Sequence, residues 1–133
     1  MLASQRRKFA KRNRFFAGLR AKFLQGKLCE VCQKHKATEV HHIAGRNAAA
    51  SDAIFSRYEN EKNWLAICGA FQNGCHELID KQSPAVWACA AKLEQQKLDI
   101  DFLRSLRSGR RFAFTMSELE QAADDLEQWR LTL

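Results

Sequence analysis

Apolar residues recur with a helical period near the start of the chain. Between residues 4 and 24 the large apolar side chains stand at Phe9, Phe15, Phe16, Leu19 and Phe23. Arginines and lysines lie between them. This pattern predicts an amphipathic helix whose phenylalanine stripe packs in the core. Gly26 follows the last apolar position and predicts the end of the helix.

The pattern changes from helical to extended in the middle of the chain. It predicts a tight turn over residues 29–32, an extended segment over 38–43, a loop over 44–62 with one helical turn near 53–58, a strand over 63–68 and a helix over 75–81. The strand is expected because its residues are almost all apolar, whereas the loop is rich in small and polar residues.

Helical patterns return after residue 82. Ser83 and Pro84 are typical of a helix start, with serine as the N-cap and proline in the first turn, and they predict a helix to about residue 98. Asp99 or Asp101 is suited to cap a further short helix that ends near residue 109.

The last part of the chain is predicted to be extended over residues 111–114 and helical over 118–130. Ser117 and Glu120 have the spacing of a capping box at the start of this acidic helix. The elements together predict a single α+β domain over residues 1–133, mostly helical. It would consist of a helical segment over 1–28, a small core over 29–82 and a helical extension over 83–133.

Composition supports a folded protein without a membrane span. Apolar residues make up 46% of the 133 residues and charged residues 28%, with one proline and six glycines, as in ordinary globular domains. The longest uncharged stretch, residues 63–76, is too short and too polar to cross a bilayer. No apolar signal-peptide core follows the basic start. We therefore expect a cytoplasmic protein with no membrane partner.

Positive charge is concentrated at the start of the chain. The net charge is +7, and residues 1–28 contain nine basic residues and no acidic one, whereas the rest of the chain sums to −2. A basic segment of this kind points to nucleic acid; an anionic membrane surface and a merely solvated helix face are the alternatives. The candidate phosphate contacts are Arg6, Arg7, Lys8, Lys11, Arg12 and Arg14.

Four of the five cysteines have a spacing that suits a zinc ion. Cys29-x-x-Cys32 is a common zinc half-site, because a two-residue turn lets both thiolates reach one tetrahedral ion. Cys68 and Cys75 supply a second pair, separated by six residues. The alternatives are reduced core thiols, or a site in which His35 replaces one thiolate. Cys89 is expected to be a buried structural thiol.

Two adjacent histidines, His41 and His42, lie between the cysteine pairs. Neighbouring side chains on an extended backbone point apart, so the two imidazoles cannot readily bind one ion together. One metal ligand and one general base are the roles that suit such a pair. His76 lies at the start of the next helix and is a candidate second ligand.

This ordered set of residues resembles the HNH endonuclease family. The resemblance covers residues 29–80 and rests on the cysteine pairs, His41-His42, Asn63 and Cys75-His76. It implies a ββα-metal core with a structural Zn²⁺ held by Cys29, Cys32, Cys68 and Cys75. It also implies that His41 and His76 bind a catalytic divalent cation such as Mg²⁺ or Mn²⁺, that His42 activates water, and that Asn63 pins the loop between the strands.

The activity that the resemblance implies is hydrolysis of DNA to products with a 5′-phosphate and a 3′-hydroxyl. Arg46 is a candidate phosphate contact, and Asp80 a candidate further ligand. The small size favours a phage or mobile-element origin, in a bacterium or a phage-infected cell. Two other functions stay open: a non-catalytic, zinc-stabilised nucleic-acid-binding module, and a protein–protein adaptor that uses the acidic C-terminal helix. The C-terminal helices are expected to pack on the body or to form a homodimer or partner interface.

Overall fold

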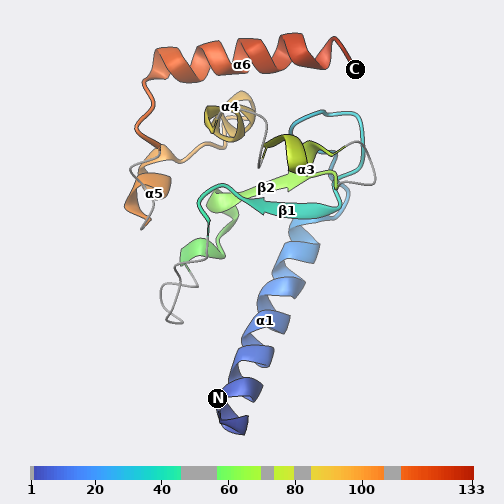
Figure 1. Cartoon of the computed structure of the whole chain (residues 1–133), viewed down its shortest axis with the longest axis vertical. Coiled ribbons are helices and arrows are strands. Elements are labelled where there is room, and N and C mark those ends of the chain that lie inside the picture. Colours follow the sequence, from blue (N-terminus) through green and yellow to red (C-terminus); the bar gives the residue numbers. More distant parts are fainter. Residues whose placement is uncertain (1, 46–56, 70–73, 80–84, 107–111) are drawn as a thin grey trace.

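The computed structural model describes residues 2–45, 57–69, 74–79, 85–106 and 112–133. Its elements are, in chain order, α1 (Ala3–Leu24), β1 (Glu39–His42), the 3-10 turn η1 (Glu61–Asn63), β2 (Trp64–Ile67), α3 (Cys75–Glu77), α4 (Val86–Glu94), α5 (Ile100–Ser105) and α6 (Met116–Arg130). The fold is a small α+β arrangement, mostly helical, in which the described strands form one sheet (Figure 1). None of its described helices combines the length and apolar content of a membrane span.

The sheet is a two-stranded antiparallel pair at the centre of the molecule. Glu39 of β1 pairs with Ile67 of β2, and His42 pairs with Trp64. All residues of β2 are buried, and β1 is half-buried throughout. The strands expected over 38–43 and 63–68 are therefore confirmed, each slightly shorter than predicted.

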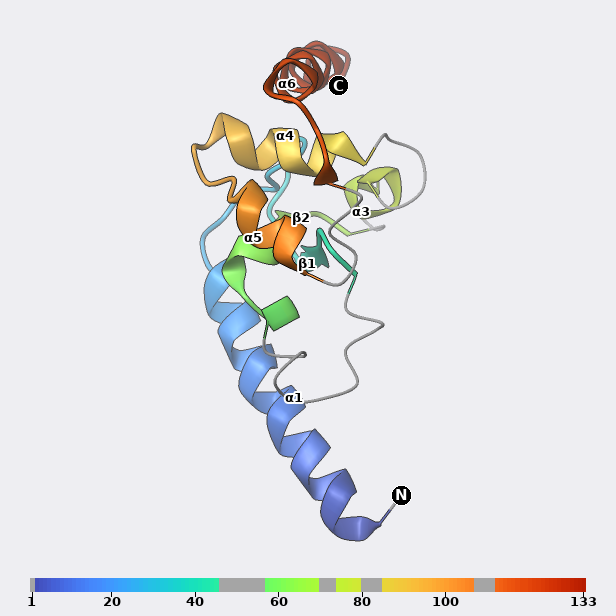
Figure 2. The ribbon, with the colours of Figure 1, turned by 90° about the vertical axis from the view of Figure 1, so that its left-hand side faces the viewer.

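Helix α1 extends away from the body (Figures 1 and 2). Its second half contacts the core: Phe16 is buried, and the ring of Phe23 packs edge-on against Trp64 with the centroids 5.4 Å apart. The expectation that the phenylalanines pack in the core is wrong for Phe15, which is 62% exposed, and the side chain of Phe9 lies outside the described part of the chain. Leu19 is 38% exposed. The body is too small to cover a helix of this length, so most of its surface faces solvent.

Helix α4 ends earlier than predicted, whereas α5 begins at one of the two predicted caps. Helix α4 stops at Glu94 rather than near residue 98, because Gln96 adopts a left-handed backbone with φ of 58°. Asp99 does cap α5, since its carboxylate accepts the Phe102 N–H at 3.0 Å. Ser83 and Pro84 lie outside the described residues.

The capping box of α6 is Thr115 with Glu118, not Ser117 with Glu120. The Thr115 hydroxyl accepts the Glu118 N–H, and the Glu118 carboxylate accepts the Thr115 N–H, both at 3.1 Å. Thr115 has the extended backbone of an N-cap, whereas Ser117 already lies inside the helix. The sequence offers the same motif twice, two residues apart, and the backbone selects the earlier one.

Other predicted elements fall partly outside the described residues. Residues 57 and 58, at the end of the helical turn expected near 53–58, are helical; the rest of that turn and residues 46–52 of the expected loop over 44–62 lie outside the described residues. The helix expected over 75–81 begins at Cys75 as predicted, but residues 80 and 81 are not described. Residues 112–114 form no strand.

Helices α4 and α6 pack on each other and hold the turn that carries Cys29 and Cys32. The rings of Trp87 and Trp129 meet edge-on between the two helices, with centroids 5.9 Å apart. Arg130 of α6 donates to the Val31 carbonyl at 2.6 Å and to the Glu30 carbonyl at 3.3 Å. The C-terminal extension thus packs on the body and braces this turn.

Glu30 ties the same turn to both β2 and α4. Its carboxylate accepts the Ala66 N–H at 2.6 Å and the Lys92 ammonium at 3.0 Å. Both charged side chains are at least 95% buried. Burial lowers the pKa of Lys92, and the carboxylate of Glu30 opposes that effect. The pair satisfies polar groups that would be costly to bury alone.

Candidate metal centre and histidine groove

Four cysteines from three parts of the chain meet beside the sheet. Cys29 and Cys32 come from the turn after α1, Cys68 follows β2, and Cys75 is the first residue of α3. Their sulfur atoms all lie within 4.8 Å of one another, and all four residues are buried. The Sγ atoms of Cys32 and Cys68 are 4.0 Å apart.

This arrangement fits a structural zinc ion. Four thiolates about 2.3 Å from a tetrahedral Zn²⁺ would be roughly 3.8 Å from each other, which is close to the observed spacing. The six-residue gap between Cys68 and Cys75 closes because Gly74 adopts a left-handed backbone with φ of 70° at the N-cap of α3. The His76 N–H then donates to the Cys68 carbonyl at 3.1 Å. His35 is not part of the cluster.

Cys29, Cys68 and Cys75 differ in the pKa of their thiols. A hydrogen bond from the Cys75 thiol lowers the pKa of Cys29 to about 5, against the effect of burial. Burial raises the pKa of Cys68 to about 11, and the pKa of Cys75 is raised chiefly by its hydrogen bond to Cys29. Four adjacent thiolates repel one another, and a divalent cation bound among them would offset that repulsion.

Cys89 is separate from this cluster. It lies in α4 with no exposed surface, and burial raises the pKa of its thiol to about 12. The thiol is therefore protonated at neutral pH and unreactive. The expectation of a buried structural thiol is confirmed.

His41 and His76 contact each other edge-on, and His76 directly follows Cys75 of the cysteine cluster. The two imidazole rings, one from β1 and one from α3, have centroids 5.4 Å apart. The Nδ1 atom of His76 lies 2.5 Å from the Glu39 carboxylate. A carboxylate accepts hydrogen bonds but cannot donate one, so Glu39 favours a proton on Nδ1 and leaves the lone pair on Nε2. That is the nitrogen His76 would offer to a cation.

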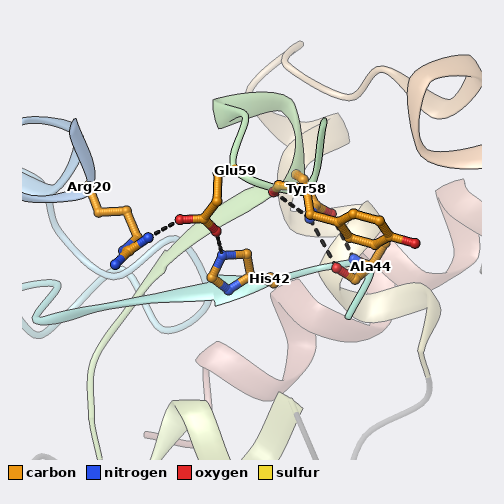
Figure 3. Close-up of polar contacts among 6 residues, drawn as sticks. Arg20, His42, Ala44, Tyr58 and Glu59 are labelled. Atoms are coloured by element: carbon orange, nitrogen blue, oxygen red, sulfur yellow. Dashed lines mark hydrogen bonds and ion pairs between the residues drawn. The ribbon is translucent and has the colours of Figure 1, made fainter. Parts of the chain in front are cut away.

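His42 forms a different group with Glu59 and Arg20 (Figure 3). Its Nε2 is hydrogen-bonded to one carboxylate oxygen of Glu59, and the guanidinium of Arg20 pairs with the other oxygen. The Glu59 side chain has no exposed surface. Residues from α1, β1 and the segment before η1 therefore converge on one buried carboxylate.

Asn63 ties together the two ends of the long connection between the strands. Its Oδ1 accepts the Ala44 N–H at 2.7 Å, and its Nδ2 donates at 3.0 Å to the carbonyls of both Ala44 and Tyr58. Asn63 is fully buried. These bonds fix the backbone next to Glu59 and two residues after His42.

The three histidines share one groove between α1 and the sheet. The groove has a volume of about 580 Å³ and is lined by His41, His42 and His76 together with Arg20 and Glu39, among others. The structure thus brings the three predicted histidines together on one surface. Arg46 and Asp80 lie outside the described residues.

The predicted phosphate contacts lie along α1. These residues are Arg6, Arg7, Lys8, Lys11, Arg12 and Arg14. All are exposed except Arg12, which is half-buried. Arg20, on the same helix, faces the groove instead, where it pairs with Glu59. The basic helix and the histidine groove are therefore adjacent.

Three residues of the candidate site are absent from the sequence prediction: Glu39 and Arg20 line the groove, and Glu59 contacts His42 and Arg20. Glu39 can be predicted from the strand pattern, because alternation places it on the same face as His41, two residues away. Glu59 and Arg20 gave no such indication. They are 39 residues apart in the chain and meet only in the folded structure.

Comparison with known proteins gives no family assignment. No protein-family model, no curated protein and no solved structure matches this chain. The function must therefore be argued from the site alone.

Proposed function

We propose that this protein is a metal-dependent HNH-type endonuclease that hydrolyses DNA phosphodiester bonds to 5′-phosphate and 3′-hydroxyl ends. The observation that carries the proposal is the shared groove of His41, His42 and His76, which adjoins a basic helix and a four-cysteine cluster. His42 contacts Glu59, whereas His41 and His76 contact each other, which suits two separate tasks.

The proposed roles follow from the contacts of each side chain. His42 takes the proton of the attacking water, because its ring is held by Glu59 beside the groove. His41 and His76 are the candidate ligands of a divalent cation, because their rings lie side by side with centroids 5.4 Å apart. Bound there, a divalent cation would neutralise charge on the scissile phosphate and on the leaving 3′ oxygen.

The cysteine cluster has a structural role in this proposal. A core of this size gains much of its stability from a bound ion. A zinc held by four thiolates has no open coordination position for substrate, so it would not take part in hydrolysis. The catalytic cation and the structural zinc are therefore separate, one in the groove and one in the cysteine cluster.

The DNA affinity is expected to come mainly from α1. Replacing Arg6, Arg7, Lys8, Lys11 and Arg12 by glutamine removes five charges with little change in helix propensity. Each neutralised phosphate contributes about −0.9 to the slope of log affinity against log salt, so the wild-type slope should be steeper by roughly 4.5 if all five reach phosphates. Binding titrations at several salt concentrations measure both slopes, and zinc content should not change. Equal slopes would show that α1 does not track DNA.

The activity itself is tested with supercoiled plasmid. We expect nicked or linear product with Mg²⁺ or Mn²⁺ and none with EDTA, at an EDTA concentration and time that leave the structural zinc in place. End-labelling before and after phosphatase treatment should place the phosphate on the 5′ side. Tight DNA binding with no cleavage under any divalent cation would support a non-catalytic zinc-stabilised module. Absence of both would point to a protein–protein adaptor.

A further inference from the structure

We propose that Glu59 is the positioning residue that fixes the proton of His42 on Nε2, and that Arg20 locks Glu59 in the orientation this requires. The inference rests on the proposed function in treating His42 as the general base. The proton position itself can be measured whether or not the protein cleaves DNA.

The Glu59 carboxylate lies between Arg20 and His42. Its side chain has no exposed surface, and a buried carboxylate stays ionised only where donors surround it. Arg20 supplies one such donor, and one oxygen of Glu59 pairs with it. The other oxygen contacts Nε2 of His42 (Figure 3). Arg20 carries only donors, so the oxygen facing it must remain an acceptor.

The contact with Glu59 determines which ring nitrogen of His42 carries the proton. An ionised carboxylate only accepts hydrogen bonds, so a neutral His42 must place its single proton on Nε2 to satisfy Glu59. The lone pair then lies on Nδ1, the ring nitrogen that Glu59 does not engage. A general base needs that lone pair directed at its water. Glu59 thus selects the form of His42 that can accept a proton at Nδ1.

Asn63 holds the backbone that carries Glu59 and His42. Asn63 binds the Tyr58 carbonyl, next to Glu59, and both backbone groups of Ala44, two residues after His42. The Ile43 N–H also donates to the Asn63 carbonyl at 2.9 Å. One buried asparagine therefore fixes the spacing between the carboxylate and the imidazole. Because Arg20 lies on α1, the same group also links the basic helix to His42.

A change of one atom tests this arrangement. Glu59→Gln keeps the shape of the side chain but leaves one oxygen and one NH₂ group. The NH₂ group cannot face Arg20, because both would be donors, so it must face Nε2 of His42. Nε2 then has to accept, and the proton moves to Nδ1. The variant should fold with His42 in the wrong tautomer.

The direct readout is the ¹⁵N NMR spectrum of the histidine rings in the zinc-loaded full chain, above the usual range of a histidine pKa. The chain has only four histidines, so single substitutions assign each signal. We expect Nε2–H on His42 in the wild type and Nδ1–H in Glu59→Gln. Glu61→Gln, the same change at an exposed position two residues away, should leave the wild-type tautomer.

The kinetic readout is the cleavage rate at saturating DNA. Glu59→Gln should lower the rate by about 10²–10⁴-fold with DNA binding unchanged, since an amide in place of the carboxylate of a catalytic triad costs about 10⁴-fold through the same tautomer change. In the double variant Glu59→Gln with Arg20→Met, the amide can turn over and accept from Nε2. The Nε2–H tautomer should then regain population, because no neighbouring donor forces the amide NH₂ group toward Nε2.

Several results would overturn the proposal. One is Nδ1–H on His42 in the wild-type protein, which can be read even if Glu59→Gln fails to fold. Another is a Glu59→Gln variant that cleaves slowly but keeps Nε2–H, because Glu59 would then act only through stability. Lack of cleavage by the wild type refutes the endonuclease function instead, and the NMR comparison still decides whether Glu59 sets the proton position.

Discussion

Replacing Cys32 by serine should abolish tight zinc binding and unfold most of the protein. Cys32 is buried with its sulfur 4.0 Å from that of Cys68, and a hydroxyl is a poor zinc ligand compared with a thiolate. Structural zinc contributes about 10 kcal/mol to small domains, comparable with the whole stability of about 5–15 kcal/mol that native domains have. Urea unfolding followed by circular dichroism, with metal analysis of the same samples, measures both effects.

The matched control for this change is Cys89→Ser. Cys89 is equally buried but lies in α4, outside the cluster. Burying its hydroxyl should cost about 1–3 kcal/mol and leave one zinc per chain. A wild-type protein that folds stably with no zinc would contradict the metal site. The four cysteines would then be reduced core thiols.

The cysteine cluster could be predicted because its chemistry is carried by a short spacing. Two cysteines separated by two residues can reach one ion whatever the rest of the fold does. The second pair gives a weaker signal in the sequence, since a six-residue gap closes only with a suitable backbone. Gly74 provides it through its left-handed conformation at the start of α3.

The helix ends and the apolar stripe of α1 were harder to predict, for physical reasons. Thr115 and Ser117 are both good N-caps, and only the backbone path decides between them. The pattern of α1 is amphipathic, but periodicity does not say whether a partner surface exists. Phe15 remains exposed because the body does not reach it.

The contacts that support the candidate site lie beyond any local pattern. Glu59 is 17 residues from His42 and 39 from Arg20, and Lys92 is 62 residues from Glu30. Acidic and basic residues are common, so sequence alone gives no reason to pair these ones. The histidines could be selected because histidine is scarce and reactive; their partners could be identified only from the fold.

His42→Ala should reduce DNA cleavage to background while leaving the fold and DNA affinity nearly unchanged. The substitution removes the proposed base, whose contribution is realised only in the transition state, so the rate constant at saturating DNA should fall by about 10⁴-fold. The Glu59 carboxylate keeps its pairing with Arg20 in this variant, so the buried charge is not left alone.

By contrast, His41→Ala and His76→Ala should also weaken binding of the divalent cation, because these two are the proposed ligands. Cleavage rates measured across a range of Mn²⁺ concentrations separate the two classes: added Mn²⁺ should partly restore the ligand variants but not His42→Ala. His35→Ala is the matched control, since His35 lines neither the groove nor the cysteine cluster, and it should cleave like the wild type. Wild-type cleavage by His42→Ala would show that another group activates the water, and the role assigned to this histidine would be wrong.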